Sequence, residues 1–464
     1  MGRISFDKAF YKRFFMVSIP IAAQQLLKAL MYFIDNIMIG SLGEDAIVGV
    51  GNANQIAFFI MVFMFGIGSA GWVFAARFNG EGDKKGITKT LGVCLAGTLI
   101  VGALFFVLSQ TVPGGLISIF NPHPGVVKQG GDYIQIVGIS YVFIAISLSY
   151  SNVLKGCEKT RLPMIASGIA IAVNAFLNYV LIFGKFGFPE LGVKGAAIGT
   201  AVGAFLDAAL LIVISNIKRN EVAGGLRKMF PRRSHMRPFI KQFAKIGSPM
   251  IINEFLWSVS IMLMVIIYNR MGLEVAAAMA VYTALERMAY VVYAGIAHAS
   301  GVMVGNQIGA GNKDKAYEYG KRFLKITPLS TIVVGGLVIL VLPVFLRQYD
   351  ISPATLEITR NVVYSFTAIA WMMTINFTNM VGVLRGGGDT RYSMIIDLIG
   401  SWVFTLTTAF VTGIVLRWPA HWVYVCAIVT GDIFKMLMGL RRFKSKKWMH
   451  DITSGIGTVS TLEH

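Results

Sequence analysis

The sequence predicts an all-α membrane protein with twelve transmembrane helices, arranged as two parallel repeats of six. The first observation is composition, because 55% of the 464 residues are hydrophobic and only 14% are charged, whereas soluble domains carry about 25% charged residues. The second is that the charges are bunched, which leaves about a dozen windows of the roughly 20 apolar residues that cross a bilayer. The third is a set of motifs that recurs in both halves of the chain.

The apolar windows alternate with short connections, and each connection ends one predicted helix and precedes the next. The charged and polar segment Met1–Arg13 comes before the first window, which then runs on as a full span. In chain order we expect helices at about 14–39, 46–76, 88–112, 132–154, 162–184, 193–216, 242–269, 274–306, 323–346, 360–383, 392–416 and 419–440.

The connections form two alternating sets that differ in charge. The set that includes Gly40–Ala46 and Arg417–Ala420 carries few positive charges. The other set is rich in lysine and arginine: Lys84–Lys89, Lys155–Arg161, Lys218–Lys245, Lys313–Lys325 and Arg385–Arg391. Cytoplasmic connections are enriched in these residues, and both chain ends belong to the basic set. We therefore expect a multi-pass protein of the cytoplasmic (inner) membrane with both termini in the cytoplasm.

Several function classes are excluded by the sequence. The net charge of +19 comes from the connections, and the basic residues are not interleaved with aromatic ones as on a nucleic-acid-binding surface. Cys94, Cys157 and Cys426 lie far apart, unlike the cysteines of a disulfide framework or metal site. The motifs of nucleotide-binding loops, serine hydrolases and zinc proteases do not occur. We expect no nucleic-acid partner, no cofactor and no enzyme activity.

The two halves of the chain share motifs at nearly one offset, which predicts a duplicated architecture. The aligned pairs are Leu154–Arg161 with Leu384–Arg391, Pro20 with Pro249, Gly43 with Gly272, and Gly80-x-Gly82 with Gly309-x-Gly311. Each half has an even number of spans, so the repeats are parallel. In such folds the substrate pathway lies between the halves.

This duplication predicts the division of the chain. We expect an N-terminal lobe at 1–217, a basic cytoplasmic loop at 218–245, a C-terminal lobe at 246–447 and a cytoplasmic tail at 448–464. The last three residues of the tail resemble the remnant of an expression tag.

The repeated motifs resemble those of the multidrug and toxic compound extrusion (MATE) family. The resemblance is carried by Ser18-Ile19-Pro20, Asp35 and Gly40-x-Leu42-Gly43, by the Gly80-x-Gly82 connection, and by the two Leu-[Lys/Arg]-Gly-x-x-x-Thr-Arg connections. It extends to about Lys447. It implies a V-shaped, two-lobe antiporter that expels cationic or amphipathic compounds in exchange for Na+ or H+ by alternating access.

Asp35 is the first candidate for ion coupling. Placing an ionisable side chain inside a membrane span costs about 2.5–3.5 kcal/mol of insertion free energy, so such a residue is by default a candidate functional residue. The alternative is a structural carboxylate bonded to backbone and water. Asn174 and Asn178 stand one turn apart, and they are candidates to ligate Na+ with Asp35 or to hydrogen-bond it when protonated. Their alternative role is hydrogen bonding between helices. The resemblance places Asp35 at the family's first-helix acid, and some members carry an aspartate at the position of Asn178.

Four further residues are expected in the cavity of the first lobe. Gln24 and Lys28 precede Asp35 on a similar face of one helix. Lys28 either lines the cavity with its alkyl chain or acts as a counter-charge to Asp35. Tyr133 and Thr200 are placed in this cavity by the resemblance, and ordinary packing between helices is their alternative.

Two glutamates are candidates in the second lobe. The resemblance gives Glu254 a cation-coupling role. Relatives add an aspartate in span ten that this chain lacks, so the site is incomplete. Glu286 is assigned to the substrate cavity, and an ion pair with the adjacent Arg287 is its alternative.

The remaining charged residues of the second lobe are assigned gating or structural roles. They are Asp397, close to the cytoplasmic end of its span, and Arg385 in the repeated connection. Asp432 is read as structural, because Lys435 lies at a spacing that allows a local ion pair.

Transport must draw on ion gradients, since the chain lacks a nucleotide-binding loop, and one charge moved through 100 mV supplies about 2.3 kcal/mol. The expected partners are cationic or amphipathic small molecules and membrane lipids, and the chain is expected to be a monomer. One alternative is a flippase for lipids or lipid-linked saccharides, which would need basic residues lining its cavity. A passive channel is more remote, because a channel needs no duplication.

Overall fold

The computed structural model describes residues 7–223, 229, 233–349 and 351–456. Within these ranges the chain is helical with short connections, and none of the described residues forms a strand. Among the described residues, twelve helices are long and apolar enough to cross a membrane. The predicted all-α fold with twelve spans is therefore confirmed.

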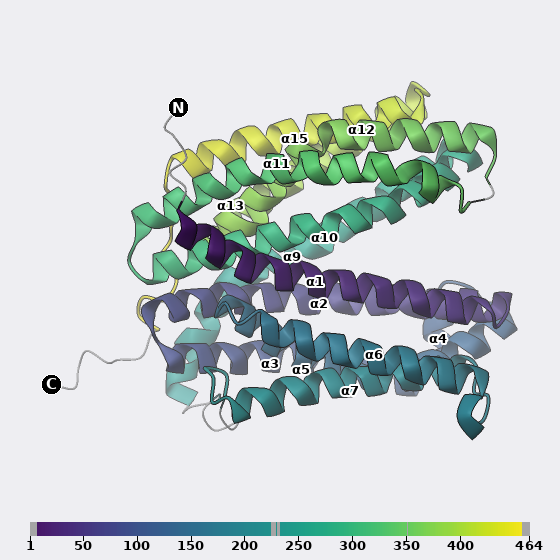
Figure 1. Ribbon diagram of the computed structural model, residues 1–464, viewed down its shortest axis with the longest axis horizontal. Coiled ribbons are helices and arrows are strands. Elements are labelled where there is room, and N and C mark those ends of the chain that lie inside the picture. Colours follow the sequence, from purple (N-terminus) through teal and green to yellow (C-terminus); the bar gives the residue numbers. More distant parts are fainter. Residues whose placement is uncertain (1–6, 224–228, 230–232, 350, 457–464) are drawn as a thin grey trace. The chain divides into compact units, whose positions relative to one another are not determined.

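Most of the α-helices are labelled in Figure 1. The first half contains α1 (Lys8–Gly40), α2 (Glu44–Glu81), α3 (Lys84–Thr111), α4 (Pro113–Ser118), α5 (Pro124–Gly156), α6 (Arg161–Phe183), η1 (Lys185–Gly187) and α7 (Val193–Ile217). The second half contains α9 (Arg233–Arg270), α10 (Leu273–Gly309), α11 (Lys313–Leu346), α12 (Pro353–Phe377), η2 (Thr378–Leu384), α13 (Thr390–Leu398), η3 (Ile399–Leu406), α14 (Thr407–Phe410), η4 (Val411–Val415) and α15 (Ala420–Lys444). The tenth span joins α12 to η2, and the eleventh runs from α13 to η4.

The turns that follow α1 and α2 recur after α9 and α10. Gly43 and Gly272 have φ angles of 103° and 133°, and Gly82 and Gly311 have φ angles of 73° and 78°. Residues with a Cβ atom rarely adopt such angles, whereas glycine does so without steric cost. The glycines repeated in the sequence therefore serve the same turn conformation in each half.

The chain divides into two compact units. Unit 1 comprises Met1–Ala22 and Ile252–Ile452, and unit 2 comprises Ala23–Ile251 and Thr453–His464. The division falls inside α1 and inside α9, in each case two residues after a repeated proline, Pro20 or Pro249. The units thus differ from the predicted lobes 1–217 and 246–447, because the first parts of α1 and α9 are exchanged between them.

Aromatic packing holds the first part of α9 in unit 2. Phe239 stacks on Phe78 with 6.0 Å between ring centroids, and Phe243 stacks on Phe74 at 5.3 Å. The spacing of Phe239 and Phe243 places both rings on one helix face. Helix α9 begins at Arg233, inside the predicted basic loop 218–245, and this packing stabilises its first part. Residues 224–228 and 230–232 of that loop lie outside the described residues.

The first part of α1 is held in unit 1 in a similar way. Phe10 and Phe14 are buried and contact Phe323 of α11 at ring-centroid distances of 5.4 and 5.6 Å. Further along this unit, the tenth and eleventh spans contain the π-helical segments η2 and η3. Such wider turns occur frequently at functional sites. Arg385 directly follows η2, and Asp397 lies two residues before η3.

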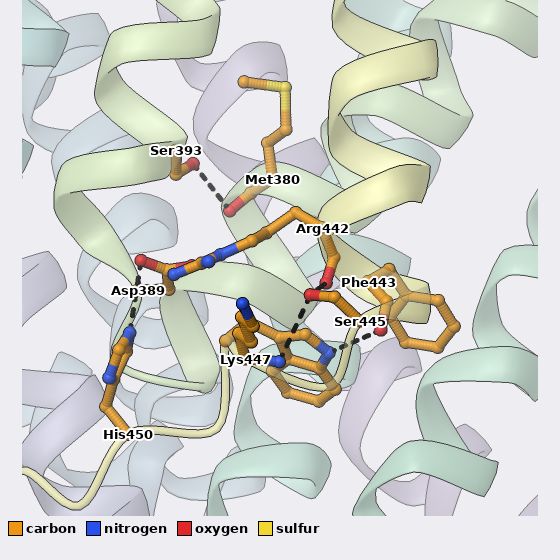
Figure 2. A network of polar contacts seen from close by, with 9 residues as sticks. Met380, Asp389, Ser393, Arg442, Phe443, Ser445, Lys447 and His450 are labelled. Atoms are coloured by element: carbon orange, nitrogen blue, oxygen red, sulfur yellow. Dashed lines mark hydrogen bonds and ion pairs between the residues drawn. The ribbon is translucent and has the colours of Figure 1, made fainter.

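The segment after α15 is packed against unit 1. Trp448 is fully buried and stacks on Phe443 at 5.7 Å. Figure 2 shows Asp389 with Arg442 and His450, whose nitrogens lie 2.6 and 3.3 Å from its carboxylate oxygens. Burial opposes the charged form of Asp389, but the His450 and Arg442 contacts outweigh it and hold the pKa of Asp389 below its usual range.

The predicted tail 448–464 is thus ordered by contacts in its first part. The tag-like residues Leu462–His464 lie outside the described residues.

Candidate functional site

A carboxylate and two amides meet inside unit 2. Asn178 of α6 donates from its Nδ2 to Oδ1 of Asp35 in α1 over 2.6 Å, and to Oδ1 of Asn174 over 3.4 Å. Both asparagines are buried, and Asp35 is half-buried. The structure therefore brings together the three residues proposed to hold Na+.

Two more of the predicted residues lie at the same place. Tyr133 of α5 is buried, interacts electrostatically with Asp35, and contacts the Thr200 hydroxyl of α7 through its phenol. Thr200 also donates to the Ala196 carbonyl oxygen in its own helix over 3.0 Å. The site around Asp35 thus combines one carboxylate with amide and hydroxyl oxygens, which are ligands that alkali and alkaline-earth cations prefer.

Small residues on α7 create the space for this site. A Cβ atom at Gly199 would lie 2.0 Å from Asn178 Oδ1, and one at Gly203 would lie 3.0 Å from Asn174 Cβ. A Cβ atom at Gly195 would lie 2.6 Å from the Leu181 backbone. The three glycines recur every four residues and line one helix face, a spacing that permits close helix approach in membranes. Sequence reasoning missed this pattern.

Asp35 forms no ion pair within the described part of the chain, so Lys28 does not act as its bonded counter-charge. Lys28 is exposed on α1 and interacts electrostatically with Lys155 of α5 instead. Gln24 also points elsewhere, since its Nε2 donates to Ser167 Oγ over 2.8 Å and to the Pro163 carbonyl oxygen over 3.3 Å.

Ser167 leads to a carboxylate that sequence reasoning did not consider. Asp207 of α7 accepts hydrogen bonds from Ser167 Oγ, over 3.2 Å, and from Ser147 Oγ. It also interacts electrostatically with Lys155. Asp207 stands inside the predicted sixth span, so the same argument that singled out Asp35 would have found it.

Two of the predicted acids of unit 1, Glu254 and Asp397, are paired with basic groups. Arg385 Nη1 lies 2.7 Å from Glu254 Oε1, and Lys435 Nζ lies 2.8 Å from Asp397 Oδ1. Asn253 Nδ2 donates to Asp397 Oδ2 over 3.1 Å. Two residues assigned to different roles, Glu254 to ion coupling and Arg385 to gating, are therefore direct partners.

The expected local pair of Asp432 with Lys435 is wrong in this structure. Lys435 contacts Asp397 on another helix and also donates to Ser401 Oγ over 2.9 Å, and no ion pair joins it to Asp432 among the described residues. A spacing of three residues permits a pair on one helix, but a closer carboxylate on a neighbouring helix competes with it.

Glu286 is surrounded by phenols. It interacts with Tyr282, whose hydroxyl lies 2.7 Å from that of Tyr424, and with Tyr268. Arg287 is exposed, and no ion pair joins it to Glu286 among the described residues. The local ion pair considered as the alternative for Glu286 is therefore not formed.

Comparison with known proteins places these features in a family. A family model described as MatE matches residues 20–180 and again residues 249–411, so each half of the chain fits the same model. A probable multidrug resistance protein NorM of Thermotoga maritima is 27% identical, over 94% of this chain and 93% of its own. The uncharacterized transporter YisQ of Bacillus subtilis is 25% identical, over 96% of each chain.

Solved structures share the fold. An outward-facing MATE transporter of the MOP superfamily superposes with a TM-score of 0.84 at 19% identity, covering 94% of this chain and 96% of its own. A MOP superfamily transporter from Pyrococcus furiosus, described as having a binding pocket of reverse polarity, gives a TM-score of 0.82 at 17% identity with the same coverage.

Proposed function

The chain belongs to the MATE family of multi-pass membrane transporters, and from this premise we propose that it is a secondary antiporter. It exports organic cations or amphipathic compounds in exchange for Na+ or H+ by alternating access. The observation that carries the proposal is Asp35, a half-buried carboxylate that is hydrogen-bonded by the neutral amide of Asn178 and has no ion pair among the described residues.

The physical reason is that a carboxylate without a fixed counter-ion must take its positive charge from a mobile one. A charged side chain within a membrane span costs about 2.5–3.5 kcal/mol, which a bound proton or Na+ would offset. An organic cation would offset the same charge, so the ion and the substrate exclude each other. Binding of the ion from one side then favours release of the substrate, which is the requirement for antiport.

Glu254 and Asp397 do not meet this requirement as they stand. Each carboxylate already has a basic partner within 2.8 Å. We therefore assign a structural or gating role to these two paired acids, and coupling to Asp35 with its asparagine neighbours. The name of the Thermotoga maritima relative, a probable multidrug resistance protein, supports drug-like compounds as substrates.

The proposed orientation follows from charge. The connections rich in lysine and arginine are assigned to the cytoplasm, so both termini face the cytoplasm and the protein resides in the inner membrane. Labelling of single cysteines introduced near each terminus, with a reagent that does not cross the membrane, tests this orientation.

Dye efflux from vesicles reconstituted with the full chain tests the function. A sodium gradient and a proton gradient are imposed separately, and the Asp35→Asn variant is compared with Asp132→Asn. Asp132 is a suitable control because it is a solvent-accessible acid of the same unit that pairs with Lys194 at 3.3 Å. We expect efflux driven by one gradient, lost in Asp35→Asn and kept in the control. Normal efflux by Asp35→Asn would refute the mechanism.

The lipid-flippase alternative is less well supported. A pyrophosphate headgroup needs several basic residues free to bind it. In unit 1 the buried Arg385 and the partly buried Lys435 are instead occupied by Glu254 and Asp397. A fluorescent lipid that is translocated as fast as the dyes would reverse this preference.

A further inference from the structure

Unit 1 contains a pocket that neither the Asp35 site nor the paired acids use. It lies between the last part of α9 and the eleventh span, and its volume is about 960 Å³. Most of the side chains that line it are apolar. Two arginines line it where its walls end, because Arg270 is the last residue of α9 and Arg417 lies two residues after η4.

The internal repeat shows why there is space at this place. In unit 2 the hydrogen bond from Asn178 to Asp35 joins the fifth span to the first. The aligned positions in unit 1 are Thr408 and Met264, at offsets of 230 and 229 residues. These two described residues form no hydrogen bond with each other. The residues that precede each of them line the pocket, so the pocket lies where unit 2 has its interhelical bond.

The two arginines distinguish unit 1 from unit 2. At the positions aligned with Arg270 and Arg417, unit 2 has Ser41 and Gly187. Both arginines are exposed, and neither forms an ion pair with any residue that the structure describes. The pocket therefore combines an apolar interior with two guanidinium groups that are free to bind an anion.

The backbone of Arg417 is in a conformation that favours glycine. Its φ angle is 54°, and the aligned Gly187 has a φ angle of 82°. Glycine adopts such angles freely, whereas a residue with a Cβ atom does so at an energetic cost. Unit 1 thus carries a charged side chain at a turn where glycine would be the more stable choice, which indicates that the guanidinium group itself is needed.

Tryptophans indicate the depth of the pocket in the membrane. Trp418 lines the pocket next to Arg417, and both Trp418 and Trp422 are exposed. Exposed tryptophans of membrane proteins gather at the level of the lipid headgroups. Trp402 lines the pocket further from this end of the span, and its buried indole N–H has no hydrogen-bond partner among the described residues. A buried donor of this kind is stabilised by a ligand that brings an acceptor.

We propose that this pocket binds an anionic phospholipid. The phosphate lies between Arg270 and Arg417, an ester carbonyl oxygen accepts from Trp402, and an acyl chain follows the apolar wall. Guanidinium groups match the geometry of phosphate, and basic pockets between membrane helices bind acidic lipid headgroups. Under the proposed orientation the lipid belongs to the outer leaflet.

The site is one for a resident lipid. Both arginines stand at one end of their spans, so they do not line a path across the membrane. Binding requires no transport cycle, and the inference therefore goes beyond the proposed antiport and can fail or succeed independently of it.

Thermal unfolding of the purified full chain in detergent tests the site. Phosphatidylglycerol and phosphatidylcholine with the same acyl chains are titrated against the wild type, Arg270→Gln, Arg417→Gln, the double variant and Arg417→Gly. Arg347→Gln is the matched control. Arg347 directly follows α11, is exposed and has no ion pair among the described residues, but it does not line the pocket.

The site predicts that phosphatidylglycerol raises the melting temperature of the wild type at about tenfold lower concentration than phosphatidylcholine. The double variant should need about tenfold or more phosphatidylglycerol for the same rise, because charged hydrogen bonds are lost. Arg347→Gln should respond as the wild type does. A wild type that responds equally to both lipids, or a double variant that responds as the wild type does, would overturn the site.

Arg417→Gly separates lost binding from lost folding. Glycine fits the left-handed turn, so this variant should melt no lower than the wild type in phosphatidylcholine. It should nevertheless need about tenfold more phosphatidylglycerol, because one guanidinium group is missing. An unchanged requirement for this lipid would show that Arg417 does not contact the phosphate.

Two further variants test the interior of the pocket. Thr407→Trp fills the space beside the exposed Thr407 and leaves both arginines in place. It should raise the required phosphatidylglycerol concentration about tenfold, and Trp402→Phe should raise it about three- to tenfold through loss of one hydrogen bond. Unchanged requirements in both variants would overturn the placement of the lipid in the pocket.

A free phosphate ion and a transported compound are the other possible occupants. Inorganic phosphate should not stabilise the wild type, and stabilisation equal to that by phosphatidylglycerol would show a bare anion site and overturn the lipid. Dye efflux is also measured in vesicles of phosphatidylcholine alone. A loss of efflux there in the double variant would assign the pocket to the substrate path and overturn the lipid site. If the wild type exports no dye, the proposed function fails, and the lipid site is judged by unfolding alone.

Discussion

The substitution Gly199→Ala tests whether α7 determines the geometry of the Asp35 site. The added Cβ atom would lie 2.0 Å from Asn178 Oδ1, where ordinary contacts begin near 3.4 Å. Asn178 must therefore recede by about 1.4 Å, and its 2.6 Å hydrogen bond to Asp35 would lengthen beyond bonding range. Loss of a hydrogen bond to a charged group costs about 1.5–3 kcal/mol, which corresponds to roughly a 10- to 100-fold change in an equilibrium constant.

The direction of the change follows from which form of Asp35 the amide stabilises. The Asn178 amide donates to the ion-free carboxylate, so its loss favours the protonated form. With a proton as the coupling ion, we expect the proton concentration for half-maximal dye efflux to fall by about tenfold or more. We also expect the maximal rate to fall, because release of the ion becomes slower.

The assay is an ion titration of dye efflux in vesicles, together with thermal unfolding in detergent. Gly51→Ala is the matched control, because a Cβ atom at Gly51 of α2 would meet nothing within 4 Å. An unchanged ion requirement and an unchanged melting temperature in Gly199→Ala would refute the argument that close packing of α7 positions Asn178.

Three further predictions concern unit 1. Arg385→Gln removes one partner of a buried ion pair and should lower the free energy of unfolding by about 3–5 kcal/mol. Adding Glu254→Gln removes the other partner and should recover most of this loss, as measured by thermal unfolding. A double variant as unstable as Arg385→Gln alone would contradict this. The pKa of Asp389 is lower in the folded protein than in the unfolded chain. Its contribution to stability is therefore fully present above the unfolded pKa of about 3.9 and is lost as the pH falls through the lower folded pKa. Asp389→Asn should melt at a lower temperature than the wild type at pH 7, and the two melting temperatures should become equal in acid. Trp448→Ala empties a fully buried position and should cost about 3–5 kcal/mol, and a wild-type melting temperature would show that the segment after α15 does not contribute to the stability of unit 1.

The sequence predicted the features that depend on local properties. Long apolar windows identified twelve spans, because each helix satisfies its own backbone hydrogen bonds within the membrane. Repeated glycines identified equivalent turns, because Gly43 and Gly272 need backbone angles that other residues avoid. An acid within a span identified Asp35 as a candidate, because its burial is costly whichever helices surround it.

Partners were harder to predict, because they lie on other helices. Lys435 was expected to pair with Asp432 on its own helix, yet it pairs with Asp397. Glu254 and Arg385 are separated by 131 residues and nevertheless lie 2.7 Å apart. Sequence spacing constrains contacts along one helix, but the packing of neighbouring helices decides between competing partners.

The sequence by itself thus determined the fold class, the duplication and which charged residues lie within membrane spans. Only the tertiary structure decided which acids pair with fixed cations, and at which residues α1 and α9 are divided between the two units. The physical reason is that hydropathy and turn conformation are properties of short segments. The charge balance of a buried group depends instead on every helix that surrounds it.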